Sequence, residues 1–104
     1  MIVNRRVFVS KAGKTSKMVE KLIESHKRGS WSGKVRIYKC EFGPSFQHVV
    51  VEAESESLAA YAEEAPTFDP KMTAEDWAEW HELEASAKNE MWELVYEQEA
   101  QADK

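Results

Sequence analysis

The chain is poor in cysteine and has no long apolar run. Cys40 is the only cysteine, which excludes an internal disulfide and is typical of a protein from a reducing compartment. We therefore expect a cytoplasmic protein. No apolar run approaches the roughly 20 residues that a membrane-spanning helix needs, and the first residues lack the pattern of a signal peptide. We expect no membrane partner.

Charge is divided unevenly along the chain, which has a net charge of −5. Residues 1–50 carry 11 Lys and Arg against 3 Asp and Glu, a net of +8, whereas residues 51–104 carry 3 against 16, a net of −13. The acidic half has to fold onto or beside the basic half, so the two compensate within the fold or across a dimer. Because acidic chains repel phosphate, we expect no nucleic-acid partner.

The length of the chain fits one domain. With 104 residues, of which 42% are hydrophobic, it can build one modest core. We expect a single domain over residues 1–98, followed by a polar tail over residues 99–104.

The middle of the chain predicts a β-hairpin. Two runs rich in β-branched and aromatic residues, 35–42 and 46–53, flank the turn sequence Gly43-Pro44-Ser45. Glycine permits positive φ, and proline cannot donate to a strand ladder, so both favour a turn.

The second run of the hairpin is apolar on both faces, because it contains Val49-Val50-Val51. Such a strand is expected to be buried on both faces, and a chain this short has helices for only one. One alternating set should face the helices and the other a second copy of the chain: Val49, Val51 and Ala53 in the first set, and His48, Val50 and Glu52 in the second. The pattern predicts a homodimer through the sheet faces.

The rest of the chain supplies two further strands and three helices. The expected strands are 2–9 and 91–98, and the expected helices are 16–28, 58–65 and a capping-box helix from Thr73 to about residue 89. The order β-α-β-β-α-α-β predicts an α+β, ferredoxin-like domain with one extra helix. Strands 1 and 3 should lie at the centre of an antiparallel sheet.

Arg6 and Glu52 are the first candidate pair. If Val3, Val7 and Val9 pack on the helices, Arg6 lies on the other face of its strand, where Glu52 is also expected. A charged pair on a covered face has to be satisfied by its partner or by a ligand. The pair is therefore either an ion pair at the dimer interface or a ligand contact.

The three histidines have different expected roles. His48 could act as a general base near neutral pH, with a hydrogen-bonded interface histidine as the alternative. His26 is expected to be structural, near the end of the first helix, where the helix dipole favours the cation. His81 and Glu84 could touch a common ion, but Ala85 stands where a HExxH motif needs its second histidine. We expect no metal site.

The whole chain resembles the dimeric α+β barrel superfamily, and within it the NIPSNAP-like proteins. The residues that carry this resemblance are, in chain order, Arg6-x-Phe8, Lys11-Ala-Gly13, Phe42-Gly43-Pro44, Val49-Val50-Val51-Glu52, Glu56-Ser57-Leu58, the Trp-containing helix, and Met91-Trp92-Glu93-Leu94-Val95. The resemblance implies two sheets facing each other across a dimer, with a cavity between sheet and helices. It implies no specific activity, because NIPSNAP-like proteins have none that is settled.

The superfamily also contains cofactor-independent monooxygenases of antibiotic biosynthesis and heme-degrading monooxygenases. Asn4-Arg5 before a Lys-x-Gly loop is similar to the heme-degrading type, in which the strand Asn contributes to the site with a Trp and a His. Here Trp77, Trp80 and His81 are clustered on one helix, which departs from that pattern.

From these observations we expect a small-molecule pocket between sheet and helices, holding an aromatic or apolar ligand. Its candidate lining is Asn4, Arg6, Tyr38, Glu52, Trp77, Trp80 and Trp92, with His48 or His81 as the base if the protein is an enzyme. Cofactor-independent oxidation is the expected chemistry in that case. The alternatives are core packing of the tryptophans in a non-catalytic dimerisation module, and a protein that binds or degrades heme.

Overall fold

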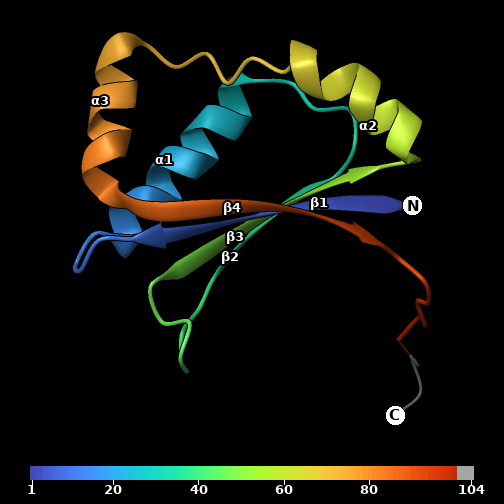
Figure 1. The fold of residues 1–104 in the computed structure, drawn as a ribbon, viewed down its shortest axis with the longest axis horizontal. Helices are drawn as coiled ribbons and strands as arrows, with labels where there is room; N and C mark the ends of the chain where they lie inside the picture. The colour runs from blue at the N-terminus through green and yellow to red at the C-terminus, as the bar shows by residue number, and fades with distance from the viewer. Residues whose placement is uncertain (101–104) are drawn as a thin grey trace.

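The computed structural model describes residues 1–100 as an antiparallel sheet with helices on one face (Figure 1). The elements in chain order are β1 (Ile2–Ser10), α1 (Thr15–Arg28), β2 (Val35–Lys39), β3 (His48–Ser55), α2 (Leu58–Glu64), the 3₁₀ turn η1 (Ala65–Thr67), α3 (Ala74–Leu83) and β4 (Glu84–Glu93). The predicted α+β order is confirmed, including the extra helix α2. Residues 101–104 of the predicted tail lie outside the described residues.

The strand order in the sheet is β2-β3-β1-β4, and each neighbouring pair is antiparallel. β1 and β3 are therefore central, as the ferredoxin-like prediction requires. Figure 1 shows α1, α2 and α3 on the same side of the sheet, which leaves its other face without a helix. Among the described residues, no helix has the length and apolar character needed to cross a membrane.

The division of faces along β3 is confirmed. Val49, Val51 and Ala53 are buried on the helix side, where the first two join a core cluster with Met18, Leu22, Trp80 and Leu83. Because side chains alternate along a strand, His48, Val50 and Glu52 point to the opposite face. We call these two surfaces the helix face and the open face.

The predicted division of faces along β1 is wrong by one residue. Phe8 packs against the core cluster, and its ring lies edge-on to that of Trp80 with 5.2 Å between centroids. Asn4 and Arg6 share that helix face, whereas Arg5 and Val7 line the open face. The alternation of valines predicted the wrong face because the polar residues Asn4 and Arg6 of β1 point inward, where they contact groups from the helices and from β4.

The predicted Arg6–Glu52 pair is wrong for the same reason. In the β1–β3 ladder Arg6 lies opposite Val51, and Arg5 lies opposite Glu52. Directly opposed residues share a face of the sheet, so Arg6 and Glu52 lie on opposite faces and cannot form an ion pair.

The boundary between the last helix and the last strand also differs from the prediction. α3 begins with the predicted capping box at Thr73 but ends at Leu83, and the strand runs over Glu84–Glu93 instead of residues 91–98. Residues 84–90 are rich in good helix formers, which extended the predicted helix. Pairing with β1 from Ile2↔Glu93 to Ser10↔Glu84 overrides that preference.

The hairpin strands are offset from the predicted runs. β2 ends at Lys39 and β3 begins at His48, so the connection covers residues 40–47 rather than three turn residues. Gly43 in this loop has φ +115°, a conformation that glycine adopts without strain.

Candidate functional site

Two adjoining cavities lie between the sheet and the helices. The first, which we call the Trp31 cavity, measures about 80 Å³ and is lined by Asn4, Arg6, His26, Trp31, Val35, Ala53, Tyr61, Ala65 and Phe68. The second, the Trp80 cavity, measures about 260 Å³ and is lined by Arg6, Phe8, Lys21, Leu22, Ser25, His26, Phe68, Pro70, Met72, Trp77 and Trp80. Arg6, His26 and Phe68 line both, so they form the boundary between the two.

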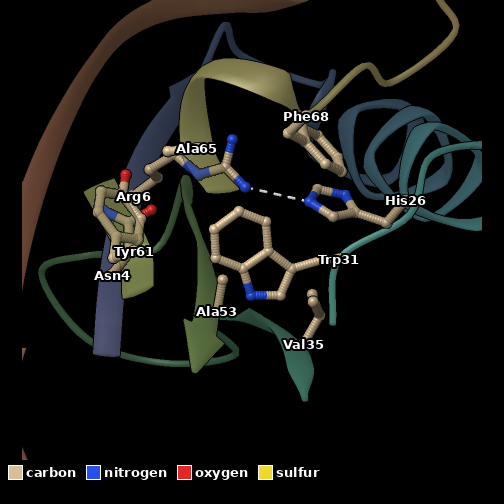
Figure 2. A pocket seen from close by; sticks show the side chains of 9 residues that line it. All are labelled: Asn4, Arg6, His26, Trp31, Val35, Ala53, Tyr61, Ala65 and Phe68. Carbon is tan, nitrogen blue, oxygen red and sulfur yellow. Dashed lines mark hydrogen bonds between the residues drawn. The ribbon is translucent and has the colours of Figure 1, made fainter. Parts of the chain in front are cut away.

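Arg6 reaches this boundary from the centre of β1. Its Nη2 donates to Nε2 of His26 across 3.0 Å, the bond drawn in Figure 2. Its Nε is buried and has no hydrogen-bond partner within residues 1–100. Burial lowers the pKa of Arg6, but a guanidinium keeps its proton in proteins. The cavities therefore share one permanent positive charge.

His26 comes from the last turn of α1 and is held in one tautomer. Its Nδ1 lies 2.8 Å from the carbonyl oxygen of Leu22. A carbonyl only accepts, so Nδ1 carries the proton and Nε2 is the lone pair that accepts from Arg6.

Burial lowers the pKa of His26. The hydrogen bond to Leu22 opposes this shift and the nearby Arg6 adds to it. The expectation of a dipole-stabilised cation at His26 is wrong, because the guanidinium and the loss of solvent both favour the neutral ring.

Aromatic side chains wall the Trp31 cavity. Trp31, from the loop after α1, lies 5.7 Å from Tyr61 and 6.0 Å from Phe68 between ring centroids. Figure 2 shows Trp31 and Phe68 on either side of the Arg6–His26 bond. The indole is fixed by donating its Nε1–H to the carbonyl oxygen of Glu54 at 3.0 Å.

The loop that carries Trp31 can approach β3 because residue 33 is glycine. A Cβ at Gly33 would collide with the carbonyl oxygen of Glu54, the same oxygen that accepts from Trp31. This close approach places the indole over the sheet, so the small residues around Trp31 belong to the architecture of the cavity.

The predicted site residues divide between the two faces of the sheet. Asn4 and Arg6 line the Trp31 cavity, and Trp77 and Trp80 line the Trp80 cavity. The remaining members lie elsewhere: Tyr38, His48 and Trp92 in a hollow on the open face, Glu52 on the same face by its register, and His81 exposed on α3. His48 and His81 therefore cannot act together on one ligand.

Of the cavity residues that were not predicted to line it, four have large side chains: His26, Trp31, Tyr61 and Phe68. Three of them lie on segments that the sequence marks as irregular or as a short extra helix. The one available signal was Trp31 itself, a large aromatic residue in a loop of small residues, Gly29 to Gly33. The described residues contain no cluster of His, Cys, Asp or Glu fit to hold a metal ion.

No protein-family model and no curated protein matches this sequence. Solved structures of the same fold exist. An uncharacterized NIPSNAP-like domain protein from Burkholderia xenovorans has a TM-score of 0.68 at 13% identity, covering 95% of this chain and 89% of that one. A NIPSNAP family protein from Agrobacterium tumefaciens has a TM-score of 0.66 at 15% identity, covering 90% and 92%.

A third solved structure carries a name from the monooxygenases. It is a candidate antibiotic biosynthesis monooxygenase from Chloroflexus aurantiacus, with a TM-score of 0.63 at 11% identity, covering 95% of this chain and 98% of that one. The predicted resemblance to NIPSNAP-like and monooxygenase-like α+β proteins is confirmed as a likeness of fold.

Proposed function

We propose that this protein binds a small aromatic or apolar molecule in the Trp31 and Trp80 cavities. The observation that carries the proposal is a pair of aromatic-walled cavities between sheet and helices that meet at a single charged boundary. Apolar walls with a few convergent polar groups are the usual composition of a small-molecule site. The NIPSNAP-like fold is compatible with such a site but names no ligand.

The size of the cavities limits the ligand. Small-molecule sites commonly measure about 300–1,000 Å³, and the larger cavity here measures about 260 Å³. A molecule with one ring, or a short branched chain, suits this space better than a multi-ring substrate.

Binding is better supported than catalysis. His26 is the imidazole that lines both cavities, and Arg6 occupies its free lone pair. The predicted bases, His48 and His81, line neither cavity. Cofactor-independent oxidation of the ligand would need a base that can accept a proton within reach of it, and no lining residue is placed for that role.

The residues of the cavities do not fit heme. Iron would need an axial ligand, and both nitrogens of His26 already have hydrogen-bond partners. Asn4, the residue similar to the heme-degrading type, donates its side-chain N–H to Asn89 and to the carbonyl oxygen of Glu90.

The proposed binding is tested with a substitution that fills the Trp31 cavity. Ala65 lines it, whereas Ala62 is exposed three residues earlier. Benzyl alcohol, benzamide and benzoate are titrated against the wild type, Ala65→Leu and Ala62→Leu, with tryptophan fluorescence and thermal shift as readouts. We expect binding to the wild type and to Ala62→Leu, and loss of binding in Ala65→Leu. Absence of binding to the wild type by all three probes contradicts the proposal.

We also propose that a second copy of the chain covers the open face. Two large aromatic residues there, Tyr38 and Trp92, are about half exposed, at 48% and 52%. Arg5 Nε and His48 Nδ1 are buried without a partner among the described residues. A two-fold related copy would bury the aromatic rings and bring hydrogen-bond partners to these two nitrogens.

Sedimentation velocity tests this assembly. Val50→Glu places a charge in the middle of the open face, and Ala62→Glu places the same charge on an exposed position of α2. We expect a dimer for the wild type and for Ala62→Glu, and a folded monomer for Val50→Glu. A monomeric wild type at micromolar concentration would contradict the proposed dimer.

A further inference from the structure

Arg6 is a largely buried cation that forms no ion pair within residues 1–100, whereas several other cations of this acidic protein are paired. Arg36 lies 2.7 Å from Glu54, Arg28 lies 3.3 Å from Asp76, and Lys21 lies 3.0 Å from Glu79. The chain contains 19 Asp and Glu, yet within residues 1–100 Arg6 forms no ion pair. No carboxylate of the described residues lines either cavity.

Most N–H donors of Arg6 also have no acceptor among the described residues. A guanidinium has five N–H donors. One of them is bound by His26, and the Nε–H is buried without an acceptor. A cation kept from water without a counter-ion is unfavourable unless some other group compensates it. Within the described chain nothing does so, which leaves the ligand as the group that can.

His26 holds the guanidinium in place without cancelling its charge. The neutral Nδ1–H tautomer is fixed by Leu22, so Nε2 accepts from Arg6 as an uncharged group. An aspartate or glutamate at the same place would orient Arg6 equally well but neutralise it. The imidazole therefore acts as a positioning residue that preserves a positive field at the boundary of the two cavities.

The aromatic walls of the two cavities favour a ligand whose uncharged part is apolar. Trp31, Tyr61 and Phe68 present ring faces and edges around one side of Arg6, and Trp80 with Phe8 lies on the other. The space is small, and Arg6 supplies its one positive charge without a carboxylate partner among the described residues, because Lys21 at the edge of the Trp80 cavity pairs with Glu79. This suits a singly charged group better than a phosphate. A carboxylate accepts two parallel N–H bonds from a guanidinium in the geometry that arginine favours.

We propose that the ligand is a small monocarboxylate with an aromatic or branched apolar body, whose carboxylate pairs with Arg6. This inference rests on the proposed binding function and names the chemical class of its ligand.

The test compares isosteric probes that differ in charge. Benzoate and benzamide, then phenylacetate and phenylacetamide, are titrated by calorimetry at pH 7.5 into the wild type, Arg6→Met and Arg5→Met. Met keeps an unbranched apolar side chain in place of the arginine stem. Arg5→Met is the matched control, because Arg5 is the neighbouring residue on the open face.

We expect the wild type to prefer each carboxylate over its amide on the order of tenfold or more, the range that a hydrogen bond to a charged group provides. Arg5→Met should keep that preference and Arg6→Met should lose it while still binding the amide. Arg6→Lys keeps the charge without the fork of donors and should retain part of the preference. Circular dichroism checks that each variant is folded.

Other outcomes separate the two proposals. Equal binding of amide and carboxylate to the wild type, with both blocked in Ala65→Leu, overturns the carboxylate assignment and keeps the small-molecule function. A carboxylate preference that survives in folded Arg6→Met overturns the role of Arg6. Failure of all four probes to bind the wild type overturns both proposals.

Discussion

Arg5 and Arg6 are neighbours in sequence, yet they lie in opposite environments. Arg5 points to the open face, where Glu52 and Glu90 stand directly across the ladder on either side of it. Arg6 points to the helix face, where its one hydrogen-bond partner among residues 1–100 is a neutral histidine. The difference shows that the position of a residue on the strand, rather than its type, decides whether carboxylates or a neutral histidine lie beside its charge.

The two faces differ in the same way for aromatic residues. On the helix face Trp80 is fixed by packing on Phe8 and Trp31 by a hydrogen bond to Glu54, whereas Trp77 at the edge of the Trp80 cavity is 46% exposed. On the open face Tyr38 and Trp92 keep about half of their surface exposed. The helix face is thus a packed interior with cavities, whereas the open face carries exposed aromatic surface.

The largest predicted effect is the difference in folding stability between Trp80→Ala and Trp92→Ala. Trp80→Ala removes a ring that is 7% exposed and belongs to the core cluster, so we expect it to lower the free energy of unfolding by about 3–5 kcal/mol. Trp92→Ala should change that free energy far less and act instead on dimer formation. Urea denaturation at a concentration where both variants are monomeric measures the difference; equal losses would remove the distinction between the faces.

A smaller loss of folding stability is expected for Asn4→Ala. Its side chain is 3% exposed and donates to Asn89 and to the carbonyl oxygen of Glu90 on β4. Asn4→Ala removes these part-buried hydrogen bonds, each of which should contribute about 0.5–1.5 kcal/mol. The control is Lys88→Ala on the open face of the same strand, which should stay close to the wild type in the same denaturation experiment.

The smallest effect should be a pH dependence from His26. Its pKa lies below the ordinary value of 6.5, so near that pH the unfolded chain takes up a proton that the folded protein does not. The stabilisation is complete above pH 6.5 and is lost as the pH falls through the pKa of the folded state. The comparison is wild type against His26→Gln, which keeps an acceptor for Arg6 but does not titrate. The wild type should lose more stability between pH 7 and pH 5; parallel curves would show that His26 has an unshifted pKa.

Much of the fold could be predicted because β3 is unambiguous. Val49, Val51 and Ala53 form a wholly apolar set that alternates with His48, Val50 and Glu52, so its faces follow from the pattern. The prediction failed on β1, where valines and arginines suggested the reverse orientation. The inward polar residues of β1 have partners far away in sequence, such as His26 for Arg6, and a period of two carries no information about such partners.

The cavity could be predicted less well than the fold. Its walls come from a loop, from α2 and from the segment after η1, and their convergence depends on tertiary contacts such as the bond from Trp31 to Glu54. The predicted position of the α3–β4 boundary was wrong for a related reason. Residues 84–90 favour a helix locally, and they form a strand because they pair with β1.

The pairing of β1 with β4 has a consequence for how the chain folds. It joins Ile2 to Glu93, so the sheet closes only after nearly the whole chain has left the ribosome. Contacts of such sequence separation form slowly, and until they form, the edge of β1 that β4 will occupy is free to pair with other chains. We therefore expect β4 to be the last strand to gain protection from hydrogen exchange during refolding, and β1 to be the segment whose edge nucleates aggregation when β4 is late.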